Sequence, residues 1–285
     1  MQFLTPLRYP GGKGRLTQCV ADIMRSNKLV GGHYLEPFAG GAGVAVSLLA
    51  LEYASHVHIN DINRSVHAFW RCVLQEADDL CAMIRSTRVS MTQWRHQRQV
   101  QNDVTASPLE LGFSTFFLNR VNRSGIILGG VIGGRAQAGD WRLDARYNKV
   151  DLIDRIQRIA QMRDRITLYN MDAEKLVREV VPTLPRKLLC YLDPPYYVKG
   201  KGLYEDHYRH QDHAAVAHEV AALDRPWIVS YDNVPQIHTL YKPFRHRIFG
   251  LRYSAQDRYQ GSEVMFFAPG LRIPAEVVPS RAAAA

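Results

Sequence analysis

The chain of 285 residues is long enough for one large domain or for one domain with a sizeable insertion. With 46% hydrophobic and 22% charged residues it reads as an ordinary globular protein, and no apolar run approaches a membrane span or a signal region. The net charge of +9 favours a polyanionic partner, and four scattered cysteines, none in a C-x-x-C pair, favour a reducing cytoplasm over a zinc or disulfide framework.

The chain begins with a glycine turn and a first β-turn-α unit. Residues 8–13 form a turn that ends in Lys13, either a solvated side chain or the partner of a carboxylate, and the spacing does not fit a phosphate-binding loop. Residues 33–36 predict a short strand, and the glycine-rich segment 37–43 predicts a turn before a helix. This segment is not a true G-x-G-x-x-G, and Glu36 would repel a pyrophosphate, so a cationic ligand fits the turn better.

The second β-strand is predicted over residues 57–61. It ends in Asp61, about twenty residues after the glycines, where an acid commonly binds the hydroxyls of a ribose. A helix with an apolar face follows from about Asn63.

Residues 75–164 change character and predict a mainly helical insert. Residues 85–98 predict a basic helical stretch and 108–123 a second helix, whereas the glycine-rich segment 124–149 has no strong helix or strand period. Its arginines, aromatic residues and flexible backbone suit contacts with the phosphates and base edges of a nucleic acid. A solvated basic face on a helical insert is the alternative.

The remainder of the chain alternates helices and strands, as expected for an α/β fold. The strand over 166–170 ends near Asp172, and the polar loop over 197–208 predicts a basic flap. The other predicted elements are helices over 151–162 and 212–223 and strands over 188–192, 227–233, 247–253 and 263–268.

The stretch 188–197 places an acid at the end of a buried strand. Its apolar first half predicts a strand of a parallel sheet, which Pro194 and Pro195 end because proline lacks an N–H and fixes its own φ. Asp193 then lies at the carboxyl end of the strand, where open α/β sheets bind ligands. An acid, free carbonyls and the ring of Tyr196 suit a planar group that carries an NH2, although an ordinary strand-ending turn with this ring in the core is also consistent.

Five segments, in this order, resemble the DNA adenine-N6 methyltransferases of the DNA adenine methylase type, the D12 class. The segments are 9–13, 36–41, Asp61, 122–125 and 193–196. The resemblance spans nearly the whole chain, and the order of a cofactor turn, a target-recognition insert and a catalytic tetrapeptide is more specific than any single motif. It implies an α/β fold with a Rossmann-like S-adenosylmethionine-dependent methyltransferase sheet and a mainly helical target-recognition insert.

The resemblance also implies a division of the chain and a set of ligands. Residues 1–74 and 165–285 would form the catalytic domain, and 75–164 the DNA-binding insert. S-Adenosylmethionine would be the cofactor, S-adenosylhomocysteine the product and double-stranded DNA the partner, with no metal. One departure from the family pattern is Ala42, which replaces the second glycine of Phe-x-Gly-x-Gly.

The expected site residues fall into three groups. The catalytic residues are Asp193, Pro194 and Tyr196. The cofactor-binding residues are Tyr9, Lys13, Glu36, Phe38, Gly40, Asp61, Asp172 and Asp193. The DNA-binding residues are Arg120, Asn122, Arg123, Arg135, Arg142 and Lys199.

The chemistry of the tetrapeptide agrees with N6 methylation. The exocyclic amine of adenine is a poor nucleophile, because its lone pair is delocalised into the ring. Asp193 and the Pro194 carbonyl can each accept one N–H, which draws electron density to the nitrogen, and Tyr196 can stack on an adenine flipped out of the duplex. Four acids, at positions 36, 61, 172 and 193, suit a sulfonium cation.

Other activities differ from N6 methylation in the residues that they need. Cytosine-C5 methylation needs a nucleophilic cysteine, and Cys190 lacks a Pro-Cys context. Methyltransferases that act on protein glutamine usually have Asn at the position of Asp193 and lack the basic insert. Cytosine-N4 methylation, a non-catalytic nucleic-acid-binding methyltransferase fold and a nicotinamide oxidoreductase stay open, as do the recognition sequence, a cognate restriction enzyme and the choice between monomer and homodimer. A bacterial or phage protein of the cytoplasm is expected.

Overall fold

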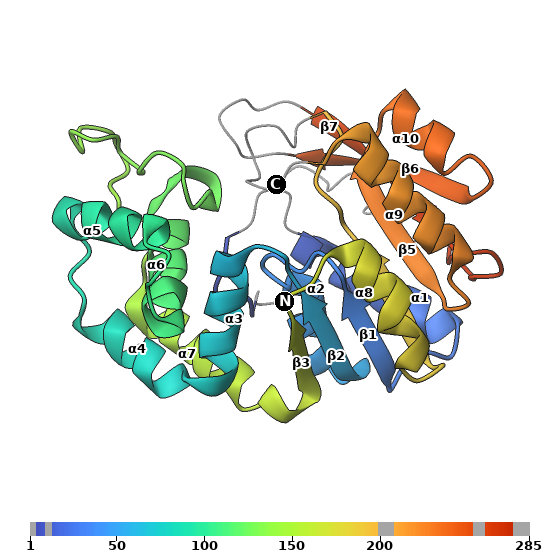
Figure 1. Cartoon of the computed structure of the whole chain (residues 1–285), viewed down its shortest axis with the longest axis horizontal. Helices are drawn as coiled ribbons and strands as arrows, with labels where there is room; N and C mark the ends of the chain where they lie inside the picture. The colour runs from blue at the N-terminus through green and yellow to red at the C-terminus, as the bar shows by residue number, and fades with distance from the viewer. Residues whose placement is uncertain (1–3, 9–12, 199–207, 253–259, 276–285) are drawn as a thin grey trace. The chain divides into compact units, whose positions relative to one another are not determined.

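The computed structural model describes residues 4–8, 13–198, 208–252 and 260–275 (Figure 1). The chain divides into two compact units, the first formed by residues 1–12 and 63–164 and the second by residues 13–62 and 165–285. Tyr9 and Lys199, both expected at the site, lie outside the described residues. Each helix in the described part of the chain is too short or too polar to span a bilayer.

The second unit is built on a seven-stranded sheet with the order β3-β2-β1-β4-β5-β7-β6. The strands are β1 (Gly32–Glu36), β2 (Ala54–Asn60), β3 (Ile166–Tyr169), β4 (Leu188–Leu192), β5 (Trp227–Asp232), β6 (Arg245–Arg252) and β7 (Gln260–Phe267). Strands β3, β2, β1, β4 and β5 are parallel, and β7 lies antiparallel between β5 and β6. This confirms the predicted Rossmann-like α/β class.

The strand order reverses between β1 and β4. On one side of this point the sheet continues through β2 and β3, and on the other side it continues through β5. The two strands are parallel neighbours, with Tyr34 opposite Leu189. The carboxyl ends of the strands at such a reversal are where open α/β sheets bind ligands, and the acid-bearing turns predicted from the sequence follow these ends.

Helices of the second unit connect the strands. They are η1 (Lys13–Leu16), α1 (Thr17–Ser26), α2 (Gly43–Ala50), α8 (Ala173–Glu179), α9 (His210–Ala222) and α10 (Pro235–Leu240). Helix α1 packs against α2, and α8 packs against α9 (Figure 1). All residues of β4 and β5 are buried, as expected for central strands covered on both faces. The sequence did not predict α8 and α10, because such short helices show too few turns of apolar periodicity.

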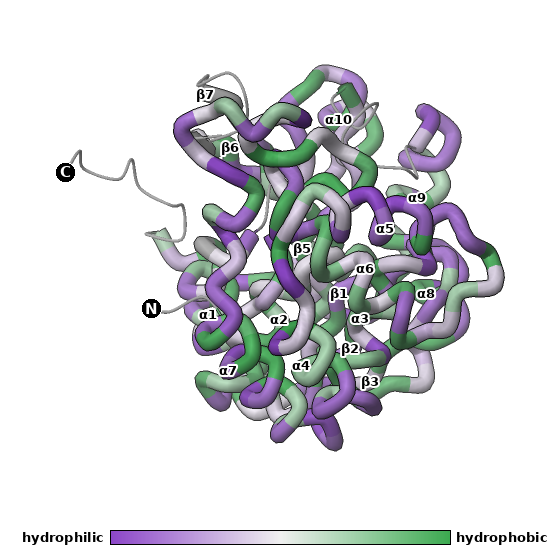
Figure 2. Tube along the Cα trace, turned by 90° about the vertical axis from the view of Figure 1, so that its left-hand side faces the viewer, coloured by the Kyte–Doolittle hydropathy of each residue, from purple (hydrophilic) through white to green (hydrophobic). Residues whose placement is uncertain are grey.

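The described elements of the first unit are helical. They are α3 (Arg64–Gln75), α4 (Ala77–Ser86), α5 (Met91–Asn102), α6 (Pro108–Val121), the short η2 (Arg123–Gly125) and α7 (Lys149–Ala160). Helix α6 is almost wholly buried and packs against α3, α4 and α5. Hydrophobic and hydrophilic stretches alternate along the helices (Figure 2), as expected for helices that cover a core with one face. Helix α3 belongs to this unit together with the expected insert.

The basic stretch 85–98 is not one helix, contrary to the sequence prediction. Helix α4 ends at Ser86 and α5 begins at Met91. The Ser90 side chain accepts a hydrogen bond from the Gln93 N–H and so caps α5. The prediction missed this break because the basic residues continue across it.

Candidate active site

Asp193 lies at the carboxyl end of β4, as the sequence predicts. The strand is buried at every position, and Pro194 and Pro195 follow Asp193 with no N–H to continue its ladder. The Asp193 side chain itself is 25% exposed. Glu36 ends the neighbouring strand β1, so two acids stand at the ends of adjacent parallel strands.

Lys13 connects three elements around Asp193. Its ammonium lies 3.1 Å from Asp193 Oδ1 and 3.1 Å from Glu263 Oε2, and it donates to the Tyr196 hydroxyl at 3.2 Å. The Tyr196 hydroxyl donates in turn to Glu263 Oε1 at 2.6 Å. Lys13, Tyr196 and Glu263 are buried, so one charged network holds η1, the turn after β4 and β7 together.

Asp193 has a further partner in β5. The Ser230 hydroxyl donates to Asp193 Oδ1 at 2.6 Å, and the Tyr191 hydroxyl lies 2.8 Å from Ser230 Oγ. Burial raises the pKa of Asp193 above its usual value, the Lys13 ammonium opposes this rise, and the Glu263 carboxylate adds to it. The carboxyl group at the centre of the site is therefore a better proton acceptor than a surface aspartate.

The turn after Asp193 is held by the last residue of β5. The two carboxylate oxygens of Asp232 accept the backbone N–H groups of Tyr197 at 2.8 Å and Val198 at 3.0 Å. Tyr196 is 3% exposed, and the Lys13 ammonium lies 5.1 Å from the centroid of its ring. A base can stack on this ring only after one face of it is uncovered.

The glycine-rich turn after β1 encloses Glu36. Burial raises the pKa of Glu36 to about 8, although the Tyr34 hydroxyl and the Ala45 N–H both donate to its Oε1. Gly40 and Ala42 have φ values of +46° and +43°. A left-handed conformation costs an L-residue about 1–2 kcal/mol, so the turn holds Ala42 in a region that favours glycine despite the methyl group.

Hydrogen bonds join the turns after β1, β2 and β3. The Gly40 N–H donates to Asp61 Oδ2 at 2.9 Å. The buried amide of Asn60 donates to backbone carbonyls of the turns after β1 and β3 at 2.8 and 3.0 Å. Asp172 is exposed in the third turn, where it accepts a backbone N–H as the N-cap of α8. Half-buried Phe38 completes the first turn.

The expected cofactor-binding residues of the described chain come together in the second unit. They are Lys13 in η1 and, on the turns at the carboxyl ends of β1, β2, β3 and β4, Glu36, Phe38, Gly40, Asp61, Asp172 and Asp193. Even with Glu36 protonated, the carboxylates of this set outnumber the single Lys13 ammonium, so its chemistry fits the sulfonium cation of S-adenosylmethionine. Among the described residues no group of three or more His, Cys, Asp or Glu could hold a metal ion.

Asn122 lies in the interior of the first unit, which differs from the expectation of a DNA contact. It is fully buried, accepts the Trp94 Nε1–H at 2.8 Å and donates to two carbonyls of the following loop at 2.9 and 2.7 Å. Asn119 is buried beside it and bonds the backbone of Arg8 through both of its amide atoms. The two asparagines therefore shape the loop after α6.

Arg120 is engaged within the first unit as well. Its guanidinium donates to the carbonyl of Arg146 at 2.7 Å. Burial, together with the cations of Arg8 and Arg155, lowers the pKa of Arg120 to about 10.

Three of the expected DNA-binding arginines are exposed on the loop after α6. The Gln137 side chain joins two parts of this loop by hydrogen bonds. It donates to the carbonyls of Ile132 and Gly134 at 2.7 Å each and accepts the Leu143 N–H at 2.9 Å. The loop is therefore ordered by its own bonds and leaves its cations to solvent. The three arginines are Arg123, Arg135 and Arg142.

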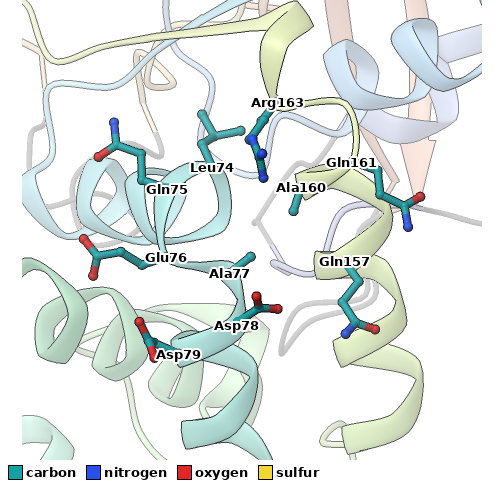
Figure 3. A pocket seen from close by; sticks show the side chains of 10 residues that line it. All are labelled: Leu74, Gln75, Glu76, Ala77, Asp78, Asp79, Gln157, Ala160, Gln161 and Arg163. Atoms are coloured by element: carbon teal, nitrogen blue, oxygen red, sulfur yellow. The ribbon is translucent and has the colours of Figure 1, made fainter.

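A hollow of about 480 Å³ lies between α3, α4 and α7 of the first unit (Figure 3). Its lining includes the carboxylates of Glu76, Asp78 and Asp79 and one cation, Arg163. Carboxylates repel phosphate groups, so this hollow does not suit the DNA backbone.

The sequence did not identify Ser230, Asp232 or Glu263 as site residues. All three lie on β5 or β7, and they reach Asp193 or its turn from strands later in the chain. One local signal was present: Glu263 leads into the apolar run of β7, and a buried acid needs a partner.

Two solved structures illustrate what this chain is similar to. A conserved hypothetical protein from Streptococcus pyogenes is 14% identical, with a TM-score of 0.36 over 85% of this chain and 89% of that chain. The rRNA methyltransferase aviRa from Streptomyces viridochromogenes is 13% identical, with a TM-score of 0.37 over 91% of this chain and 86% of that chain. No curated protein matches by sequence.

A comparison with protein-family models identifies the family. A model of the family described as D12 class N6 adenine-specific DNA methyltransferase matches residues 9–253. This match includes the Lys13 turn, the glycine-rich turn after β1, the helical insert and the Asp193 turn. The chain belongs to the D12 class N6 adenine-specific DNA methyltransferases.

Proposed function

We propose that this member of the family is a site-specific, adenine-specific DNA methyltransferase whose Asp193, Pro194 and Tyr196 act on an adenine flipped out of duplex DNA. S-Adenosylmethionine supplies the methyl group when bound, with S-adenosylhomocysteine as the product. One observation carries the assignment: Asp193 stands at the strand reversal of the sheet with its Oδ1 held by Lys13 and Ser230.

The chemical task of these residues is to make a weak nucleophile react. Asp193 and the Pro194 carbonyl each accept one N–H of the exocyclic amine, which directs the remaining lone pair towards the methyl donor. Because the network around Asp193 is buried, its fixed charges act with little screening. Tyr196 contacts the flipped ring once a face of its own ring is uncovered.

The turns of the second unit provide the cofactor site in this proposal. Asp61 accepts hydroxyls of the ribose, Lys13 and Phe38 lie at the methionine end, and the exposed Asp172 lies near the cofactor adenine. Tyr9 and Glu36 belong to the same site, and no metal takes part. The excess of carboxyl groups over ammonium groups at this edge supports the placement of a cation.

The first unit provides DNA binding. Its exposed Arg123, Arg135 and Arg142 suit base and phosphate contacts, whereas Arg120 and Asn122 act by shaping the loop that carries them. By function the chain divides into a catalytic part, 1–74 with 165–285, and a DNA-binding part, 75–164, although helix α3 packs with the DNA-binding part in the first unit. All four cysteines are buried thiols, which agrees with use in a bacterial or phage cytoplasm.

Transfer of labelled methyl groups to duplex DNA tests the function directly. The purified chain, incubated with methyl-labelled S-adenosylmethionine and plasmid DNA, should release labelled N6-methyladenine when the DNA is digested to nucleosides. Labelled N4-methylcytosine would instead support the rival amine chemistry. DNA binding with no label transferred would support the non-catalytic alternative.

Replacing Asp61 by alanine should weaken cofactor binding. The change removes an ionised acceptor expected to bind hydroxyls, and a hydrogen bond to a charged group is worth about 1.5–3 kcal/mol, so the dissociation constant should rise roughly 10–100-fold. Calorimetric titration with S-adenosylmethionine measures this. Asp164→Ala is the matched control, because that side chain is 94% exposed. Equal affinities for both variants and the unchanged protein would refute the cofactor placement.

Alanine variants of Arg123, Arg135 and Arg142 should separate base contacts from phosphate contacts. A base-reading arginine is worth about 1–3 kcal/mol of discrimination, so its loss should relax the target sequence at one position. A phosphate-binding arginine should weaken binding to all DNA and reduce the salt slope by about one unit. We expect at least one of the three to be of the first kind.

The measurement is sequencing of methylated sites together with binding at several salt concentrations. Arg158→Ala, on α7 of the same unit, is the control and should change neither. If all three variants keep the original target with no relaxed position, the bases are read elsewhere in the chain.

A further inference from the structure

Ser230 is the junction of a buried hydrogen-bond chain that ends on Asp193. It is fully buried in β5, one residue beyond Val229, which lies opposite Leu192 in the parallel pairing of β5 with β4. The register therefore brings the serine beside the acid that follows β4. Its Oγ lies 2.6 Å from Asp193 Oδ1 and 2.8 Å from the Tyr191 hydroxyl.

The direction of this chain follows from what each group can donate. Ionised Asp193 can only accept, so the single hydroxyl proton of Ser230 is donated to Oδ1. The serine oxygen is then free to accept from Tyr191. Burial raises the pKa of Tyr191 well above its usual range, so the phenol keeps the proton that it donates. Tyr191 thus fixes the rotation of the Ser230 hydroxyl, and the hydroxyl fixes Asp193.

Both anchors of Asp193 bind the same oxygen. Lys13 and Ser230 contact Oδ1, and among the described residues no side chain or backbone group donates a hydrogen bond to Oδ2. A carboxylate held by one oxygen cannot exchange its two oxygens without breaking both contacts. The unbonded oxygen is consequently the one available to accept an N–H from a target amine in the partly exposed part of the site.

We infer that Ser230 is a positioning residue for methyl transfer, and that Tyr191 acts through it, by holding Asp193 with Oδ2 presented to the target amine. The inference rests on the proposed role of Asp193 and adds the residues that orient it. A buried serine that only satisfies the Tyr191 hydroxyl is the competing explanation, and the two differ in what they predict for turnover.

The first test is Ser230→Ala. Removing a residue that orients a directly acting group typically lowers activity roughly 10–100-fold, and we expect kcat of Ser230→Ala to fall by that factor. KM for DNA and the dissociation constant of S-adenosylmethionine should change no more than about twofold. The acid limb of the pH–rate profile should also move to higher pH, because the serine hydrogen bond favours the ionised form of Asp193. The other groups that bear on Asp193 stay in place, and they are Lys13, Tyr34, Glu36, Tyr191 and Glu263.

The second test is a double-mutant cycle with Tyr191→Phe. If the tyrosine acts only through the serine, Tyr191→Phe alone should lower kcat less than Ser230→Ala, and the double variant should be no slower than Ser230→Ala. If the fold-losses in kcat of the two single variants multiply in the double variant, Tyr191 acts by another route and the inference is overturned.

Folding is controlled with Ser114→Ala, which removes a hydroxyl that is also fully buried but bonds a backbone carbonyl of the first unit. Its kcat and pH–rate profile should equal those of the unchanged protein, even if its melting temperature is lower. Ser230→Cys, which keeps a weak donor, should be faster than Ser230→Ala and serves if the alanine variant does not fold.

Asp193→Ala, assayed in parallel, separates the two proposals. If Ser230→Ala keeps the kcat and the pH–rate profile of the unchanged protein while Asp193→Ala is inactive, only this inference is overturned. Full turnover in Asp193→Ala overturns the proposed function.

Discussion

Asp193→Ala is expected to slow methyl transfer by at least roughly 10²–10³-fold, the effect of removing one preorganised polar partner from a reaction centre. In the proposed function this carboxylate accepts an N–H of the reacting amine and does not contact phosphate, so affinity for DNA should stay within a few fold. Single-turnover transfer of a labelled methyl group gives the rate, and binding to the same duplex gives the affinity.

Asp193→Asn distinguishes charge from shape in the same experiment. The amide keeps one acceptor oxygen but loses the charge that the Lys13 ammonium contacts at 3.1 Å. It should therefore bind DNA as the unchanged protein does and still be slow. Turnover that persists in both variants, at comparable DNA affinity, would remove Asp193 from the mechanism.

The features of the site that the sequence predicts are those set by neighbouring residues. An apolar run followed by an acid and two prolines dictates a buried strand, its end and the acid's place at the sheet edge, and β4 has these features. The same reasoning recovers β1 and its glycine-rich turn, because alternation of strand and helix patterns is local.

The missed features depend on contacts between distant residues. Ser230 lies 37 positions from Asp193, and Glu263 lies 67 positions from Tyr196. Their approach follows from the strand order β4-β5-β7, and no periodicity within β7 reveals that it enters the sheet antiparallel beside β5.

Asn122 differs in the opposite way: its residue type suits DNA binding, but its side chain is buried and stabilises the fold. An asparagine among arginines fits base recognition, yet its buried amide satisfies Trp94, 28 positions away, and two carbonyls of its own loop. Burial could not be predicted here, because Asn122 is the C-cap of α6, where the helical period no longer says which face is covered.

The Lys13 network sets the second large effect, which concerns stability. Lys13→Met leaves the carboxyl groups of Asp193 and Glu263 without their shared cation, and Glu263 is 0% exposed. Removing one partner of a buried ion pair typically costs about 3–5 kcal/mol, because the remaining charge is uncompensated. We expect a loss of this size in the free energy of unfolding, measured by urea denaturation, together with weaker binding of S-adenosylmethionine.

Glu263→Gln provides the rescue that identifies the cause. In the unchanged protein the Tyr196 hydroxyl donates to Glu263 Oε1 at 2.6 Å. The glutamine amide keeps an acceptor for this hydroxyl but carries no charge. In the Lys13→Met background this change removes the buried carboxylate that lost its partner, so the double variant should be more stable than Lys13→Met alone. Directly interacting residues show coupling energies of about 0.5–3 kcal/mol, and the cycle should fall in that range.

A surface lysine supplies the comparison for the Lys-to-Met change itself. Lys175 is 56% exposed and pairs with Glu179 at one helical turn, a contact worth about 0.2–0.5 kcal/mol. Lys175→Met should therefore unfold almost as the unchanged protein does. Two results would show that the buried ammonium does not hold the turn after β4 to β7: an equally small loss of unfolding free energy in Lys13→Met, or additive effects of Lys13→Met and Glu263→Gln. The geometry of Asp193 would then depend on β5 through Ser230 and Asp232.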